Sequence, residues 1–211
     1  MTARNPAVDA LLSRVRAAVR AQPVTVEQVP SHAMVRRVAR DTADLTGLFA
    51  AKASAVGMRV TRVSDAELDA ALARLLEGRG RTVVAVRDAG LAARATAAAG
   101  TRRAANDNDD LLFDCEVGIT DVDCAIAESG SLVVSTNGRI RNAWITPPIH
   151  IAIVRAAQVV ADLVDLFESR PDALDAASTT IITGPSKTAD IEGVLVTGVH
   201  GPGAVEILLV G

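Results

Sequence analysis

The chain has 211 residues, of which 49% are hydrophobic, and its formal net charge is −3. This length allows one large domain or two small ones with a buried core. The aromatic residues are Trp144 and three Phe, so a surface that stacks the bases of single-stranded nucleic acid is not expected. The two cysteines, Cys115 and Cys124, are too few for a structural zinc site or an iron–sulfur cluster, which need about four ligands.

The beginning of the chain does not look like a targeting segment. Residues 1–22 lack the apolar run of a secretory signal and carry Arg14, Arg16 and Arg20 instead. The sequence has no uninterrupted apolar run of about 18 residues, so a membrane-spanning helix is not expected. We therefore expect a cytoplasmic protein with two reduced thiols.

Charge is distributed unevenly along the chain. Residues 1–105 carry 17 Lys or Arg against 9 Asp or Glu, whereas residues 106–211 carry 5 against 16. The two halves thus have formal charges of +8 and −11. Such a split indicates either a basic face for an acidic ligand or partner, or a compositional bias without function.

The first predicted element is a helix that begins at Asn5-Pro6, where Asn can cap and Pro fits the first helical position. Apolar residues then recur at helical spacing until Pro23 ends the helix. A helix with one apolar stripe must dock on something. We therefore assign residues 1–40 to an N-terminal helical arm and residues 41–211 to one α/β domain.

The rest of the first half predicts alternating helices and strands. Asp41 is expected to cap a helix through about Val56, and Ser64 with Glu67 forms a capping-box pattern that begins another helix. The remaining predicted elements are strands at 58–63 and 82–86 and a helix at 91–99. Short connections between such elements favour a mostly parallel sheet flanked by helices.

The second half predicts mainly strands. Residues 124–128 and 132–135 are expected to form a hairpin around Ser129-Gly130-Ser131. Further strands are predicted at 149–154, 179–183 and 205–210. A helix is predicted at 158–168, with Val159, Leu163, Val164 and Phe167 on its inner side. Residues 106–110 are polar and acidic and predict an exposed loop.

Four short clusters of Gly, Pro and small polar residues interrupt the apolar strands of this half. They lie at residues 127–131, 146–150, 183–190 and 199–203. Ligands of open α/β sheets bind outside the carboxyl ends of the strands, where we expect these loops. Glycine and proline can also serve only to turn the chain.

Together these segments resemble the LUD-domain family, specifically its lactate-utilisation protein C branch. The resemblance rests on four runs: GITDVDCAIAESGS at 118–131, PPIHI at 147–151, TGPSKTADIE at 183–192 and GVHGP at 198–202. Its layout covers about residues 40–211 and is sharp only in the second half. It implies a fold related to the group of ribose-phosphate isomerases, glucosamine-phosphate deaminases and CoA-transferases.

The resemblance also implies a function. It predicts a cluster-free subunit of a system that oxidises L-lactate to pyruvate without NAD, binding a small anionic ligand beside iron–sulfur partner proteins. The chain itself is expected to hold no cofactor. Two alternatives stay open: a free-standing enzyme of the CoA-transferase or sugar-phosphate isomerase type, and a non-catalytic scaffold.

Three residues are candidate catalytic groups. Small residues flank Glu128, so its carboxylate could approach a ligand as a base or nucleophile, or it could accept backbone N–H bonds in a tight turn. His150 and His200 each lie near a proline, and histidine transfers protons near neutral pH. Either histidine could instead hold a loop in place.

The candidate ligand-binding residues are small or cationic. Residues 186–188 precede a segment that could begin a helix, whose N-terminus would bind an anion together with Lys187; the hydroxyls could also serve only as helix caps. Arg139 and Arg141 flank a turn and could clamp a carboxylate. The predicted set is Ser129, Gly130, Ser131, Gly184, Ser186, Lys187, Thr188 and Gly201, and no metal site is predicted.

Overall fold

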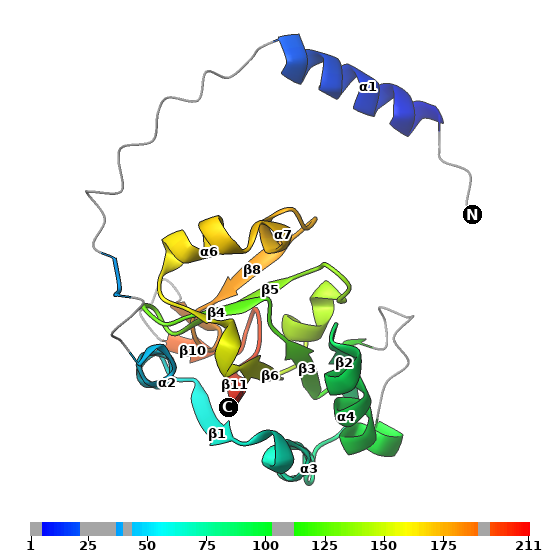
Figure 1. The fold of residues 1–211 in the computed structure, drawn as a ribbon. Coiled ribbons are helices and arrows are strands. Elements are labelled where there is room, and N and C mark those ends of the chain that lie inside the picture. Colours follow the sequence, from blue (N-terminus) through cyan, green and yellow to red (C-terminus); the bar gives the residue numbers. More distant parts are fainter. Residues whose placement is uncertain (1–5, 22–36, 40–43, 103–111, 190–194) are drawn as a thin grey trace. The chain divides into compact units, whose positions relative to one another are not determined.

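The computed structural model describes residues 6–21, 37–39, 44–102, 112–189 and 195–211 (Figure 1). The chain divides into a unit of Met1–Arg36 and a unit of Arg37–Gly211. The predicted loop at 106–110 and the predicted cap Asp41 lie outside the described residues.

In the first unit the structure describes one helix, α1 (Pro6–Ala21), which confirms the predicted N-terminal helix. Its apolar residues Val8, Leu11 and Val15 are exposed within this unit. Asp9 lies in the first turn and Arg20 in the last, where each charge complements the helix dipole.

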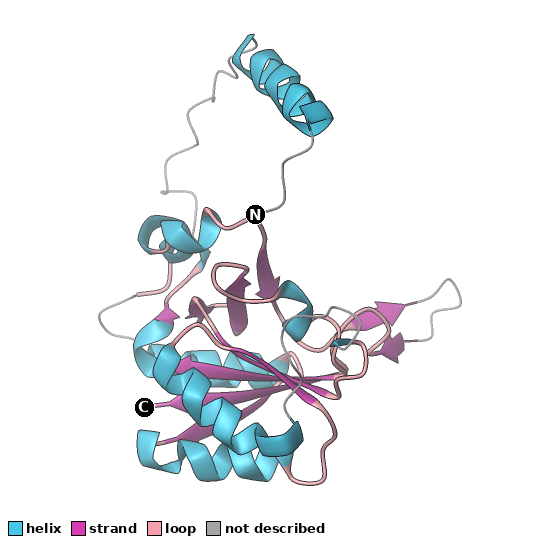
Figure 2. Cartoon of the chain, turned by 90° about the vertical axis from the view of Figure 1, so that its right-hand side faces the viewer, coloured by secondary structure: helices cyan, strands magenta, loops and turns pink. Residues whose placement is uncertain are grey.

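The second unit is built on a five-stranded sheet in the order β1-β11-β6-β3-β2, in which all neighbours are parallel. The predicted mostly parallel sheet is therefore confirmed. Figure 2 shows its strands with helices packed against them. The strands are β1 (Arg59–Val63), β2 (Thr82–Ala85), β3 (Val117–Asp121), β6 (Ile149–Arg155) and β11 (Ala204–Val210).

The two faces of this sheet are covered differently. Helices α3 (Leu68–Leu76) and α4 (Ala89–Ala99) bury apolar side chains against one face. Helix α2 (Leu45–Ala55) and a second sheet, in the order β7-β4-β5-β8, share the core on the other face. The strands of this second sheet are β4 (Cys124–Ile126), β5 (Ser131–Ser135), β7 (Val159–Val160) and β8 (Thr179–Ile182).

The remaining elements are short. Helices α6 (Leu163–Ser169) and α7 (Pro171–Leu174) pack on the second sheet, and β9 (Lys187–Ala189) pairs antiparallel with β10 (Leu195–Thr197). The single-turn 3₁₀ helices are η2 (Asp65–Glu67), η3 (Gly100–Arg102), η4 (Arg141–Trp144) and η5 (Ala156–Gln158).

Several local signals act as the sequence predicts. The Ser64–Glu67 capping box is present, with Glu67 Oε2 accepting from the Ser64 backbone N–H at 2.8 Å, although a 3₁₀ turn precedes the α-helix. Gly57 has a positive φ of 94° just after α2, where glycine avoids the steric cost of a Cβ. Within the described residues the cap of α2 is Asp44, which accepts from Gly47 N–H at 2.8 Å.

Three expectations about elements are wrong. The sequence does not predict the central strand β3, because Gly118 and Asp121, which are unfavourable in strands, interrupt and end its β-branched residues. The predicted helix at 158–168 is instead β7 followed by α6, which Asp162 caps. Residues after Ser186 begin strand β9, so no helix N-terminus lies there.

The side chains that α6 buries are also not the predicted ones. Leu163 and Phe167 were expected inside but are exposed, whereas Asp165 and Leu166 are buried. Burial of Asp165 is possible because it accepts from the Ala161 backbone N–H at 3.1 Å and pairs with Arg37.

Arg37 explains why the second unit begins before residue 41. Its Nε donates to Asp162 Oδ2 at 2.7 Å, and the backbone N–H of Val38 donates to the same oxygen at 3.1 Å. These bonds hold residues 37–38 on the start of α6. The boundary placed between residues 40 and 41 stays a prediction.

The Gly118→Ala variant tests how tightly β3 packs beneath η4. A Cβ at Gly118 would lie 1.8 Å from the carbonyl oxygen of Ala143, which is backbone and cannot swing aside. We expect the free energy of unfolding to fall by about 2–3 kcal/mol, measured by urea denaturation. In the control Gly211→Ala the Cβ would lie 3.7 Å from Ala156 Cβ, an ordinary contact. Equal stabilities of the two variants would contradict this packing.

Candidate functional site

The predicted site residues fall in three separate places of the second unit. Glu128 and its small neighbours form the turn between β4 and β5, His150 is the second residue of β6, and Lys187 with His200 belongs to the β9–β10 region. The parallel pairing of β6 and β11 puts the loops before them at the amino edge of the sheet. The expectation that all these loops lie at the carboxyl edge is therefore wrong.

The turn between β4 and β5 is held by hydroxyl groups and by a glycine. Ser131 Oγ is hydrogen-bonded to Ser129 Oγ and to Thr183 Oγ1, each at 2.7 Å. Gly130 has a φ of 70°, and a Cβ there would lie 2.2 Å from the backbone nitrogen of Ala53. Glu128 donates its backbone N–H to Ala161 O at 3.0 Å and is exposed. The turn therefore packs against α2 and is hydrogen-bonded to Thr183, which follows β8. The Glu128 side chain is exposed to solvent.

His150 is fully buried between the sheet and the second layer. Its Nε2 and Thr120 Oγ1 share a hydrogen bond of 2.9 Å, and its Nδ1 has no hydrogen-bond partner among the described residues. Burial lowers the pKa of His150 to about 4, so the ring is neutral at neutral pH. In this conformation His150 cannot reach a dissolved ligand, and its contacts are those of a core residue.

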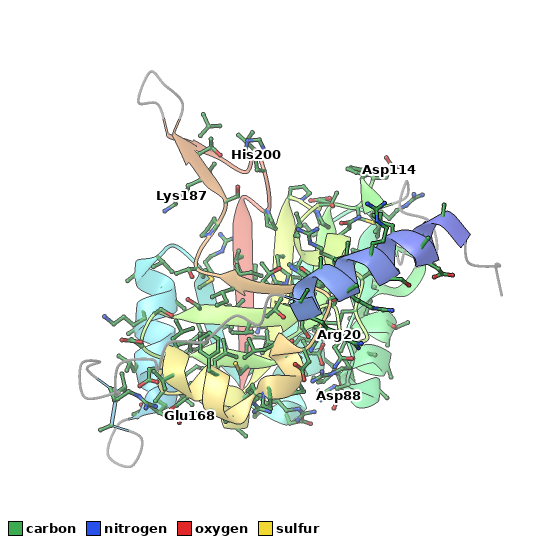
Figure 3. All side chains as sticks on the ribbon, turned by 90° about the horizontal axis from the view of Figure 1, so that it is seen from above. Arg20, Asp88, Asp114, Glu168, Lys187 and His200 are labelled. Atoms are coloured by element: carbon green, nitrogen blue, oxygen red, sulfur yellow. The ribbon has the colours of Figure 1, made fainter. Side chains whose placement is uncertain are left out.

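The β9–β10 region carries exposed polar side chains. Lys187 and His200 are exposed, and both lie in the region of the β9–β10 ribbon (Figure 3). The backbone N–H of Ser186 donates to Pro202 O at 2.8 Å, which ties this region to the loop before β11. A Cβ at Gly201 would lie 3.3 Å from Ser186 Cβ, so glycine permits this approach. Thr188 lies within β9, and Gly184, with a φ of 108°, packs against Val56 O.

A different cluster occupies the carboxyl edge, where β2 and β3 end. Arg139, whose side chain is 0% exposed, donates from Nε to Asp121 Oδ1 at 2.7 Å and from Nη1 to Asp123 at 3.1 Å. Arg87 Nη1 lies 3.0 Å from Asp123 Oδ1. We call these four residues the carboxyl-edge cluster. Arg139 is thus a buried structural cation and not the free clamp that its turn suggested.

The cluster keeps the Asp121 carboxylate ionised. Burial raises the pKa of Asp121, but the Arg139 hydrogen bond and the backbone N–H groups of Arg87 and Asp88 outweigh it, so the net shift is downward. Asp121 therefore acts as an anion that orders the chain, and it is not suited to act as a general acid. Two further buried atoms, Arg139 Nη2 and Ser135 Oγ, have no partner among the described residues.

A hollow of about 290 Å³ opens beside this cluster. Arg87 and Arg155 are partly exposed on its rim, with 38% and 44% of their side chains accessible. Two arginines can bind one carboxylate through charge-assisted hydrogen bonds. The full lining is Arg87, Asp88, Leu91, Asp121, Arg155 and Gln158. We call this the arginine hollow.

Sequence reasoning missed the arginine hollow because it missed β3. Once 117–121 is taken as a strand, Asp121 falls at its carboxyl end, where ligand sites of α/β sheets collect. Arg155 likewise lies at the carboxyl end of its strand, β6.

In the part of the chain that the structure describes, no three His, Cys, Asp or Glu side chains are grouped to hold a metal ion. None of its helices is long and apolar enough to cross a membrane.

Comparisons with known proteins agree on one family. The LUD domain family model matches residues 47–210. A lactate utilization protein C of Geobacillus sp. (strain WCH70) is 37% identical over 101 residues, covering 45% of this chain and 42% of that protein. One of Exiguobacterium sp. (strain ATCC BAA-1283 / AT1b) is 36% identical over 107 residues, covering 48% and 46%. The matched segments therefore span less than half of these relatives.

A solved structure shows the same fold. The crystal structure of a DUF162 family protein from Deinococcus radiodurans, at 1.70 Å resolution, is similar with a TM-score of 0.63 and 22% identity. The similarity covers 79% of this chain and 96% of that chain. At this identity the likeness concerns the fold alone.

His150 should make the protein sensitive to acid. The unfolded state takes up a proton near pH 6.5, whereas folded His150 stays neutral until about pH 4. The unfolded state thus binds more protons in this window, and stability falls as the pH falls through it. Between pH 7 and 4.5 we expect His150→Gln to lose about 2 kcal/mol less unfolding free energy than the wild type. Parallel pH profiles in urea denaturation would show that His150 is not the acid-sensitive group.

Proposed function

Because this chain belongs to the LUD domain family, we propose that it takes part in the use of lactate as a subunit of a system oxidising L-lactate to pyruvate. The proposal is supported by the relatives named lactate utilization protein C. In this proposal the chain binds a small anion and holds no iron–sulfur cluster, the clusters being on partner proteins. Cys115 and Cys124 are both buried and unbonded to each other, which suits structural thiols better than cluster ligands.

The observation that supports anion binding most directly is the arginine hollow. Arg155 is free enough to turn toward a ligand, since its nearest carboxylate oxygen, Asp65 Oδ1, is 4.0 Å from Nη1. The Arg155 backbone N–H donates to Gln158 Oε1 at 2.9 Å, and Gln158 Nε2 donates to Val122 O at 2.7 Å. These bonds hold the backbone that carries Arg155, while 44% of its side chain stays accessible. A small carboxylate could then sit between Arg155 and Arg87.

The hollow competes with the site expected from sequence motifs. Glu128, Lys187 and His200 are exposed and could meet a ligand on the outer surface, but Glu128 would repel a carboxylate. The arginine hollow has two cations on its rim, and its two carboxylates are engaged by other groups: Asp121 pairs with Arg139, and Asp88 accepts from the Leu91 backbone N–H at 2.8 Å. Electrostatics therefore favour the arginine hollow for lactate.

Lactate binding measured by isothermal titration calorimetry tests this choice. We expect Arg155→Gln to weaken lactate binding about tenfold to a hundredfold, because a charge-assisted hydrogen bond is lost. Arg74→Gln is the matched control, since Arg74 is exposed on α3 outside the hollow. Unchanged affinity in Arg155→Gln, with a loss in Lys187→Gln, would place the ligand at the motif loops instead.

The role in lactate oxidation is tested in cells. Deleting the gene should abolish growth on lactate and leave growth on pyruvate intact, because only the oxidation step would be lost. Complementation with the wild-type chain should restore growth, and Arg155→Gln should restore it poorly at equal protein abundance. Normal growth of the deletion strain on lactate would overturn the proposal.

A further inference from the structure

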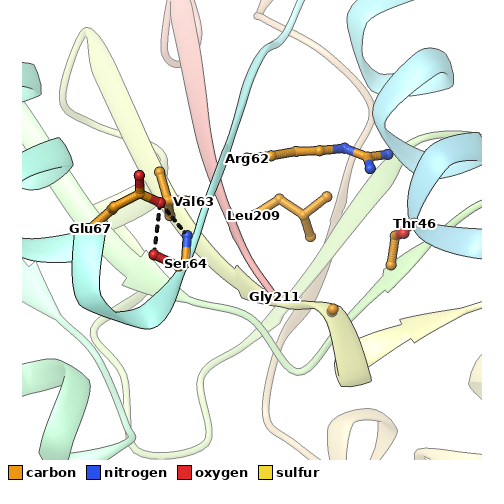
Figure 4. A pocket seen from close by; sticks show the side chains of 8 residues that line it. Thr46, Arg62, Val63, Ser64, Glu67, Leu209 and Gly211 are labelled. Atoms are coloured by element: carbon orange, nitrogen blue, oxygen red, sulfur yellow. Dashed lines mark hydrogen bonds between the residues drawn. The ribbon is translucent and has the colours of Figure 1, made fainter.

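A second hollow, of about 310 Å³, lies at the carboxyl ends of β1 and β11 (Figure 4). It differs from the arginine hollow in every lining residue. Its lining is Thr46, Arg62, Val63, Ser64, Glu67, Ala156, Leu209 and Gly211. Sequence motifs did not point to it, since its residues come from both ends of the domain.

The lining is apolar in the middle and polar at two opposite ends. Leu209 lies in the middle, Glu67 and Ser64 lie at one end, and Arg62 extends toward Thr46 of α2 at the other (Figure 4). Leu209 is 3% exposed and forms an apolar floor with Ala156 and Gly211, whereas Val63 belongs to the core on the opposite face of the sheet. Such a surface favours a ligand with an apolar body.

The charged groups at the two polar ends differ in their partners. Glu67 Oε2 accepts from the backbone N–H of Ser64 and from its hydroxyl at 2.7 Å, and these bonds lower the pKa of Glu67. Arg62, in contrast, forms none of the ion pairs found in the described residues, and it acts on Asp44 only at longer range. Glu67 thus stays ionised at one end of the hollow, and Arg62 provides the positive charge at the other end, beside α2.

We propose that this hollow binds a monoanion with an apolar body, its anionic group on Arg62 and its body over Leu209 and Ala156. The carboxylate of a short fatty acid is the simplest such ligand. Glu67 fixes the orientation, because the anionic end is repelled from it and attracted to Arg62. The proposal goes beyond lactate binding, which uses Arg155 and the neighbouring hollow.

Calorimetric titration of the full chain with straight-chain carboxylates, from acetate to octanoate, tests the apolar body. Each methylene that enters the hollow should lower the dissociation constant by about two- to fourfold until the floor is covered. Affinity that does not depend on chain length would overturn the proposal, as would no binding of hexanoate up to its solubility limit.

Two variants locate the binding. Arg62→Gln should weaken hexanoate binding about tenfold or more. Arg81→Gln, just before β2 at the opposite edge of the sheet, should leave it unchanged. Gly211→Leu should fill the hollow, because a Cβ there meets only Ala156 Cβ at 3.7 Å, and hexanoate binding should be lost. Both variants should keep the wild-type melting temperature. Hexanoate affinity that survives both changes would overturn the proposal.

The two proposals can fail separately. Arg155→Gln should weaken lactate binding and spare hexanoate, and Arg62→Gln should do the reverse. Loss of both ligands in Arg155→Gln alone would mean that one site takes both acids, which would overturn the second hollow but not lactate binding.

Discussion

Two buried carboxylates, Asp121 and Asp123, constrain the carboxyl edge of this fold. A charge removed from water must be paired and hydrogen-bonded to be tolerated. Arg139 meets this need for both, and Asp123 also accepts from the Ser135 backbone N–H at 2.7 Å. Because Asp121 ends a strand of the parallel sheet and Ser135 ends a strand of the second sheet, this pairing joins the two sheets. It also fixes the backbone of Arg87, and with it the rim of the arginine hollow.

At the amino edge of the same sheet, the contacts of Gly118 and His150 involve no ion pair. There the contacts are steric and neutral: Gly118 lies under the carbonyl of Ala143, and His150 is bonded to Thr120 in a dry environment. A neutral, desolvated histidine adds rigidity but no accessible acid or base. Both hollows with cationic rims lie at the other edge, where the strands of the parallel sheet end.

The sequence predicted what local chemistry determines and missed what tertiary contacts determine. The capping box at Ser64, the stop at Gly57 and the strand–helix alternation are local, and the structure has them. Strand β3 and the burial of Asp165 depend on partners far along the chain, namely β6 and Arg37. The expectation that the four loops lie at the carboxyl ends of the strands depended on which ends of the strands share an edge, and topology alone decides that. The chemical roles proposed for these residues stay predictions.

Several ion pairs within the second unit join the basic half of the chain to its acidic half. Arginines from the basic half pair with carboxylates from the acidic half, as Arg37 does with Asp162 and Arg59 with Glu206. Part of the charge split is thus used in ion pairs between distant segments of the chain. Arg62 and Arg155 differ, since Arg62 has no close carboxylate among the described residues and Arg155 has one only at 4.0 Å. Both lie on hollows at the carboxyl edge, where an unpaired cation in a partly enclosed space attracts an anion more strongly than on an open surface. The positive charge that folding leaves unpaired there is the charge available to a ligand.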